Sequence, residues 1–221
     1  SEEPGLRQEA LSGILSLRPD ARAAVPHLIE RLSAEDPAKR EQAINLLGRM
    51  GDDSAAAVPG LIAALGQAEK DERQLIQNAL VEMGPASIPA VLESASDIPL
   101  SNLSGENWQA ECVGSIGIQA VPSLTHALKQ HSGNGAGLFS LISLQKIGDK
   151  SPTTRQAILP SLEHDQARFR GAALSALVAS TAKPNSLMPR LQAAMGDSNS
   201  LVRQAAMNAC LLYTSDAADE D

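Results

Sequence analysis

The residues best suited to chemistry are two histidines and a glutamate that recur at one place in successive segments. Each lies four residues after a proline: Glu93, His126 and His164. Imidazole and carboxylate groups are ordinary metal ligands, with bonds of about 2 Å. Neighbouring helices of a stack lie about 8–10 Å apart, however, which is wide for shared coordination. We therefore expect solvated residues that contact a partner, with no metal ion and no cofactor.

A glycine-rich run forms a second candidate site. The pattern Gly133-x-Gly135-x-Gly137 resembles a phosphate-binding loop. That chemistry requires a strand before the glycines and a helix N-terminus after them. Here a helix is expected before the run, and no closely spaced lysine follows it. We interpret the run as a loop between two repeats.

A row of arginines forms a third candidate. Its members share one place in the repeat: Arg7, Arg40, Arg73, Arg170 and Arg203. Such a row could be a basic stripe for nucleic acid. Acidic residues lie four positions before three of these arginines and close to the other two, and pairs of this kind brace adjacent repeats and satisfy helix N-termini. We favour the structural role and expect no nucleic-acid partner.

Catalysis is not indicated, and we do not expect an enzyme. No nucleophile and base occur at a credible spacing. The modest net charge and the single tryptophan argue against a base-excising glycosylase. Cys112 lies in an expected helix and cannot pair within the repeats, so the redox compartment is not predicted.

The elements that carry these residues come from an internal repeat. With Arg40 as the reference, equivalent positions follow in steps of 33 residues, with one step of 31 between Glu106 and Gly137. A period of this length indicates a solenoid or a related array. Apolar residues three and seven positions after the reference share one helical face. A glycine eleven positions after it suits the left-handed cap of that helix.

A second helix is expected to follow in each repeat, and a proline marks its start. The six instances are Val25-Pro26, Val58-Pro59, Ile88-Pro89, Val121-Pro122, Leu159-Pro160 and Met188-Pro189. Proline suits the first helical position because that N–H has no partner within the helix. The exception is Pro160, which lies only ten residues before Arg170; we expect a helix that starts near Pro152 and is kinked or broken at Pro160.

These patterns predict an all-α fold, a right-handed α-solenoid of about six stacked helix pairs with a period of 33. One solenoid is expected over residues 1–209, since stacked pairs share a continuous core. The repeats are expected at about 1–33, 34–66, 67–100, 101–132, 133–164 and 165–196, with a partial seventh at 197–209. The first helix is expected at Leu6–Leu17, its partner at Pro26–Leu32, and a longer loop at 94–105.

The last twelve residues differ from the repeats. Residues 210–219, CLLYTSDAAD, resemble the conceptual translation of a sequencing adapter. We therefore expect 210–221 to be an artefactual tail on a truncated gene fragment, adding only a residue or two to the last helix. The chain has 26 acidic and 18 basic residues, net charge −8; without the four acids of the tail the charge is −4.

The repeat R-x-x-A-x-x-x-L-G-x-M-G followed by A-V-P-x-L-I-x-x-L resembles HEAT-like repeats of the type also found in phycobilisome lyases. The resemblance covers residues 1–209 and departs at Glu106, at Gly137 and around Pro160. It implies first helices on a convex side, second helices on a concave side, and a role as a scaffold for proteins. An enzyme on this scaffold, similar to a bilin lyase, and a nucleic-acid-binding solenoid are the alternatives.

The functional expectation is a region of a larger bacterial protein that binds a protein or peptide on its concave face. The expected contact residues are His27, Glu30, Arg31, Glu93, His126, His164 and Arg190. No apolar run of 18 or more residues occurs, so we expect no membrane span. Neither the compartment nor the oligomeric state is predicted, and the cytoplasm is the default.

Overall fold

The structure is a computed structural model that describes residues 18–98, 107–182 and 184–218. These residues are helical or lie in turns, and no strand occurs among them. The chain divides into two compact units, Ser1–Ala90 and Val91–Asp221. Across the described ranges, no helix has the length and apolar character that a membrane span needs. The expected first helix at 6–17 lies outside the described residues.

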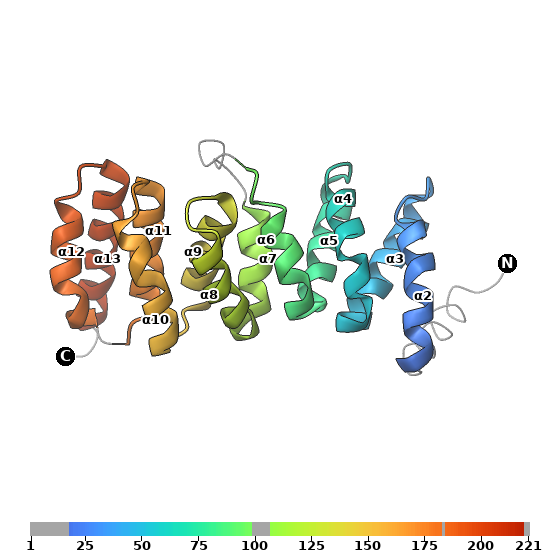
Figure 1. Cartoon of the computed structure of the whole chain (residues 1–221), viewed down its shortest axis with the longest axis horizontal. Helices are drawn as coiled ribbons and strands as arrows, with labels where there is room; N and C mark the ends of the chain where they lie inside the picture. The colour runs from blue at the N-terminus through green and yellow to red at the C-terminus, as the bar shows by residue number, and fades with distance from the viewer. Residues whose placement is uncertain (1–17, 99–106, 183, 219–221) are drawn as a thin grey trace. The chain divides into compact units, whose positions relative to one another are not determined.

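The first unit contains two layers of short helices (Figure 1). In chain order they are α2 (Arg18–Arg31), α3 (Pro37–Met50), the 3₁₀ helix η1 (Gly51–Ala57), α4 (Val58–Leu65), α5 (Lys70–Glu82) and the 3₁₀ helix η2 (Gly84–Ser87). The first helices α3 and α5 pack on each other, while α2 and α4 pack against them as second helices. Helix α6 (Ile88–Glu93) crosses the boundary between the units.

The second unit repeats this arrangement. Its elements are α7 (Trp108–Ile116), η4 (Gly117–Ala120), α8 (Val121–Gln130), α9 (Gly135–Ile147), α10 (Pro152–Ile158), η5 (Leu159–Glu163), α11 (Ala167–Ala179), η6 (Pro184–Leu187), α12 (Met188–Met195) and α13 (Ser200–Ala218). The first helices pack in sequence order, α7 on α9, α9 on α11 and α11 on α13. The predicted all-α class of stacked helix pairs is confirmed.

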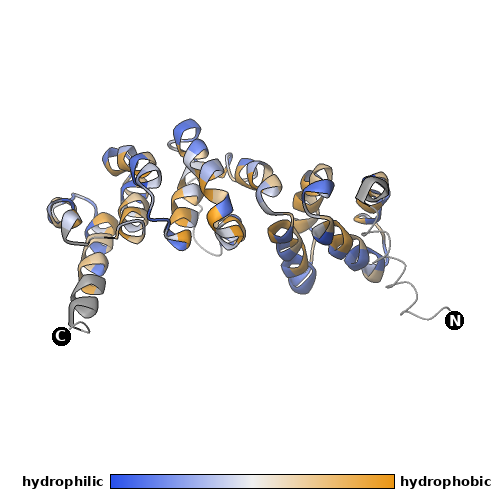
Figure 2. Ribbon diagram, turned by 90° about the horizontal axis from the view of Figure 1, so that it is seen from below, coloured by the Kyte–Doolittle hydropathy of each residue, from blue (hydrophilic) through white to orange (hydrophobic). Residues whose placement is uncertain are grey.

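The core lies between the two layers of each unit. Within a unit, the apolar faces of neighbouring helices are turned toward one another (Figure 2). Leucine, isoleucine, valine and alanine fill it, with Phe139 and Phe169 as the two buried aromatic side chains among the described residues. The leucines seven positions after the reference, Leu47, Leu80, Leu144 and Leu177, are all buried, as their spacing predicts.

Glycine follows the first helices with a positive φ, but the predicted left-handed cap is found at Gly148 and not at Gly51 or Gly117, whose ψ angles are −133° and −147°. The φ angles of Gly51, Gly84, Gly117 and Gly148 are 59°, 65°, 79° and 64°. Residues with a Cβ rarely adopt positive φ, which explains the recurrence of glycine there. In the first unit a serine completes the cap: Ser54 Oγ donates to the carbonyls of Leu47 and Gly51 at 2.6 and 2.8 Å. Ser87 makes the equivalent bonds in the next repeat.

The segments around Pro26 and Pro160 differ in where the helix begins or ends relative to the proline. The expectation that α2 begins at Pro26 was wrong, since α2 begins at Arg18 and contains Pro26. The preceding residues, RPDARAAV, are mostly good helix formers, so the turn that is 3₁₀ in the next repeat is α-helical here. The expected break at Pro160 is confirmed, because α10 ends at Ile158 and the 3₁₀ helix η5 follows.

Two glycines of the glycine-rich run, Gly135 and Gly137, pack closely against backbone carbonyl groups. Helix α9 begins at Gly135 with Asn134 as its N-cap, so part of the expected loop is helical. A Cβ on Gly135 would lie 2.1 Å from the carbonyl oxygen of Ala95, and a Cβ on Gly137 would lie 2.1 Å from that of His131. Both glycines are therefore required by backbone contacts within the unit.

The last helix is longer than expected. Helix α13 runs from Ser200 to Ala218, well beyond residue 209. Its sequence contains no glycine or proline, so nothing in it interrupts the helix. The expectation that the tail adds only a residue or two to this helix was wrong.

Candidate functional site

The second helices present one face to solvent in a regular way. The proline that opens each of them is exposed: Pro26, Pro59, Pro89, Pro122, Pro160 and Pro189. The residue two positions later turns inward; Leu28, Leu61, Val91, Leu124 and Leu191 are buried. The residue four positions after proline is exposed in five repeats: Glu30, Ala63, Glu93, His126 and Ala193. We call these five residues the exposed row.

In the first unit, α2 carries the three site residues predicted there. His27, Glu30 and Arg31 are all exposed. His27 Nδ1 lies 3.8 Å from Glu30 Oε2, one helical turn away. The structure therefore brings these three residues together on one solvent-facing surface. Pairs this exposed contribute little to stability, so their side chains remain available to a partner.

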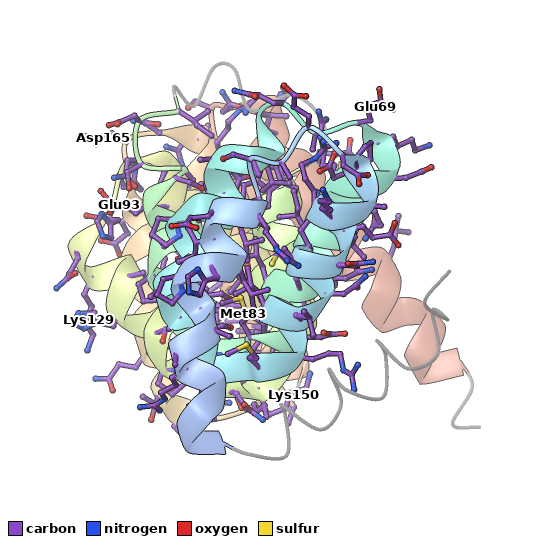
Figure 3. All side chains as sticks on the ribbon, turned by 90° about the vertical axis from the view of Figure 1, so that its right-hand side faces the viewer. Glu69, Met83, Glu93, Lys129, Lys150 and Asp165 are labelled. Carbon is purple, nitrogen blue, oxygen red and sulfur yellow. The ribbon has the colours of Figure 1, made fainter. Side chains whose placement is uncertain are left out.

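In the second unit, three predicted residues lie exposed on separate second helices. Glu93 ends α6, His126 lies in the middle of α8, and Arg190 lies in the first turn of α12. Figure 3 shows Glu93 and Lys129 pointing away from the ribbon on the same side of the molecule. Among the side chains that the structure describes, no group of three histidine, cysteine or acidic residues could hold a metal ion.

His164 lies elsewhere than the register predicted. It follows η5 instead of lying on a helix. Its Nδ1 accepts the amide N–H of Gln166 at 3.0 Å, and its ring stacks on the buried Phe169 with centroids 4.5 Å apart. The cause is the short segment after Pro160, which forms a 3₁₀ helix and leaves His164 in the turn that leads to α11.

The arginine ladder, meaning the arginines at the reference position, is structural in the described repeats. Arg40 donates from Nη1 to the carbonyls of Ala34 and Glu35, and from Nε and Nη2 to both carboxylate oxygens of Glu72 in the next repeat, at 2.6 and 3.0 Å. The hydrogen-bonded ion pair raises the pKa of Arg40 and lowers that of Glu72. Asp36, the acid expected to pair with Arg40, instead caps α3 through the N–H of Ala38.

Arg170 repeats the same arrangement in the second unit. It donates to the carbonyls of His164 and Asp165 and makes a bidentate pair with Asp197 at 2.8 and 2.9 Å. Hydrogen bonds from Arg170 and from the amide of Asn199 lower the pKa of Asp197 to about 2. Each of these arginines thus joins the turn before its own helix to the following repeat.

Two hollows lie beside these ion pairs at the same place in their repeats, and sequence analysis did not predict them. One, of about 260 Å³, is lined by Leu32, Ser33, Ala34, Arg40, Ala64, Gln67, Ala68 and Glu72. The other, of about 220 Å³, is lined by Leu162, Glu163, Arg170, Leu174, Arg190, Ala193, Ala194, Asp197 and Val202. Each is lined by residues of the first and second helices of two consecutive repeats and of the turns that join them. The sequence feature that could have indicated the hollows is a pair of small residues, Ala63-Ala64 in one repeat and Ala193-Ala194 in the other. Each pair follows its ladder arginine by the same number of residues.

The thiol of Cys112 is not part of the exposed face of the second helices. It is buried in α7, and burial raises the pKa of its thiol to about 12. The thiolate is the reactive form of cysteine, so this side chain is inert at neutral pH.

Comparison with known protein families supports the helical repeat seen in the sequence and the structure. Residues 1–97 match the family model for HEAT repeats. The resemblance to HEAT-like repeats seen in the sequence is thereby confirmed. Helical repeats of this kind are a fold typical of protein-interaction scaffolds and not of catalysis.

Two solved structures are similar over most of the chain. A crystal structure of an engineered protein shares 13% identity, with a TM-score of 0.39; the similarity covers 95% of this chain and 64% of that one. A designed armadillo repeat protein shares 14% identity, with a TM-score of 0.38; the similarity covers 84% of this chain and 98% of that one. No curated protein matches the sequence.

Proposed function

We propose that this chain is a scaffold that binds a protein or an extended peptide along the exposed face of its second helices. The observation that carries the proposal is the exposed row. Its members vary in charge and size between repeats, from Glu30 to Ala63 to His126, while the leucines two positions earlier stay buried. A repeat that keeps its core and varies one face presents different side chains to successive parts of one partner.

The hollows support binding of an extended segment. Each opens beside the exposed row, with Arg190 and Ala193 in the lining of one and Ala64 and Gln67 in the lining of the other. A volume of 220–260 Å³ can take one or two side chains of a partner. Small residues at the rim let the partner's backbone approach the helices. The opposite charges of Glu30 and Arg190 favour a polar partner that carries both signs of charge.

The test uses a phage-displayed library of linear peptides selected on the immobilised chain. The face variant combines Glu30→Lys, His126→Glu and Arg190→Glu. The control variant makes the same three kinds of change on exposed positions of first helices, Glu41→Lys, Gln145→Glu and Arg49→Glu. His164 is left unchanged because its ring packs on Phe169.

Selected peptides should bind the parent chain and the control variant alike in fluorescence anisotropy, and the face variant at least about tenfold more weakly, as expected when contact residues are lost. Circular dichroism should show the same helicity for all three proteins, because every changed side chain is exposed. Failure to enrich any peptide would refute the proposal, and so would equal affinity for the face and control variants.

A further inference from the structure

The hollow lined by Arg170 combines a buried apolar floor with an exposed charged rim, and we call it the Arg170 hollow. Leu174 and Val202 line it with exposed fractions of only 2% and 3%, so they form its floor. Glu163 and Arg190 line it as well and are exposed, so they form its rim. Pockets that bind ligands commonly join an apolar lining to a few polar groups that fix orientation.

The ion pair in the wall of this hollow has little capacity left for a charged side chain. Arg170 makes four hydrogen bonds, two with Asp197 and one with each of the carbonyls of His164 and Asp165. Asp197 also accepts the amide N–H of Asn199. A charged side chain that entered the hollow would lose its water without finding a free partner in this pair, which is costly. An apolar side chain gains from burial on the floor, and about 220 Å³ has room for one large apolar side chain.

The two charges of the rim lack partners in the described part of the chain. Neither the carboxylate of Glu163 nor the guanidinium of Arg190 makes a hydrogen bond or an ion pair with residues 18–98, 107–182 and 184–218. Glu163 ends η5, and Arg190 lies in the first turn of α12. A segment that fills the hollow therefore meets one negative and one positive group, and complementary charges in that segment are favoured.

The hollow lined by Arg40, which we call the Arg40 hollow, shows that this combination is not a general feature of the repeat. Residues at the same distance from the two arginines occupy equivalent positions. In place of Glu163, Arg190 and Val202, the first unit has Ser33, Gly60 and Glu72. The Arg40 hollow therefore carries no rim charge at these positions, and it has a carboxylate where the Arg170 hollow has part of its apolar floor. The two hollows should take different side chains.

We propose that the Arg170 hollow binds one large apolar side chain of the partner peptide, with an acidic residue of that peptide on Arg190 and a basic residue on Glu163. The assignment rests on the proposed function, because it takes the partner to be an extended segment, and it adds the chemistry by which that segment is recognised. The floor supplies affinity through burial, and the two rim charges supply selectivity.

Counter-selection of phage-displayed linear peptides tests the apolar part of this assignment. Peptides selected on the full chain are depleted on Ala194→Leu, which fills the Arg170 hollow, so the surviving peptides depend on that hollow. The matched control is Ala64→Leu, the same change at the equivalent half-buried position of the Arg40 hollow. Leucine and alanine are both good helix formers, so circular dichroism should show the parent's helicity for both variants.

The surviving peptides should share a large apolar residue with an acidic and a basic residue close to it in sequence. In fluorescence anisotropy they should bind the parent and Ala64→Leu alike, and Ala194→Leu at least about tenfold more weakly. If peptides enrich on the parent but none of this kind survives, the assignment is overturned and the proposed function stands. If nothing enriches on the parent, the proposed function fails as well. An equal loss with Ala64→Leu would also overturn the assignment.

Charge reversal tests the rim through exposed side chains, so its result does not depend on how the filled hollow folds. Arg190→Glu should weaken a surviving peptide at least about tenfold, and replacing the acidic residue of the peptide by lysine should recover most of the loss. Glu163→Lys should respond in the same way to a peptide whose basic residue is replaced by glutamate. The control is Arg49→Glu on an exposed position of a first helix, which should bind as the parent does. Unchanged affinity for both rim variants, or no recovery with the reversed peptides, would overturn the pairing.

Discussion

Alanine substitution at two equivalent glycines should have opposite effects on stability. Gly48 and Gly114 both lie eight positions after the reference position of their repeat, which Arg40 and Glu106 occupy, and both are inside a first helix. Glycine-to-alanine inside a helix gains about 1 kcal/mol. At Gly48 the new Cβ would lie 2.9 Å from Cα and 3.0 Å from Cβ of Ala79, so α3 and α5 must separate. Overpacking of this kind costs about 1–3 kcal/mol. We expect Gly48→Ala to destabilise the protein by about 1 kcal/mol.

At Gly114 the close atoms belong to a flexible side chain. The new Cβ would lie 2.7 Å from Cδ of Lys146, which can rotate away at the cost of its exposed ion pair with Glu111. Exposed pairs contribute about 0–1 kcal/mol, so Gly114→Ala should be neutral or slightly stabilising.

Thermal melting followed by circular dichroism separates the two outcomes. For a chain of this size, 1 kcal/mol shifts Tm by about 2–4 °C. Gly48→Ala should melt below the parent, and Gly114→Ala at or above it. If Gly48→Ala melts with or above Gly114→Ala, the helices separate without cost and the argument from backbone contact is wrong.

Three further outcomes are expected. Ser87→Ala should lower the free energy of unfolding by about 1–2 kcal/mol in urea titrations, because its buried hydroxyl donates to two main-chain carbonyls at 2.8 Å. The pKa of Asp197, about 2 against an ordinary 3.8, means that its pairing with Arg170 stabilises the fold above about pH 4 and loses this effect as the pH falls toward 2; the difference in Tm between the parent and Asp197→Asn should shrink over that range. In a Cys210→Ser background, Cys112 should react with a maleimide at pH 8 only after unfolding, because it is buried and its pKa is about 12.

The helix pairs were predictable because their signals are local. Glycine at a positive φ and proline at the first helical position mark where each helix ends or begins, and Gly51, Gly117 and Pro59 lie where the period places them. The break before Pro160 followed from the same local rule. The early start of α2 did not, because the residues before Pro26 are mostly good helix formers and the helix begins at Arg18 despite the proline.

The acidic partners of the ladder arginines could not be predicted from the sequence pattern. Arg40 binds Glu72 and Arg170 binds Asp197, yet these two acids occupy different positions in their repeats, 32 and 27 residues after the arginine. Only the stacking of repeats brings either acid to its arginine. His164 was misplaced for a related reason, because a register counted from proline assumes an α-helix where the chain forms a 3₁₀ helix.

The interruption of the arginine ladder at Gly137 has a consequence for how the chain responds to ionic strength. Arg40 and Arg170 join neighbouring repeats through charge, and salt weakens such pairs. Gly137 offers no guanidinium, and at this joint α9 meets α11 through apolar contact, with Phe169 Cε1 3.2 Å from where a Cβ on Gly137 would lie. Apolar contacts do not weaken with salt. A rise in ionic strength should therefore weaken the ion pairs of Arg40 and Arg170 and leave the apolar contact between α9 and α11 unchanged.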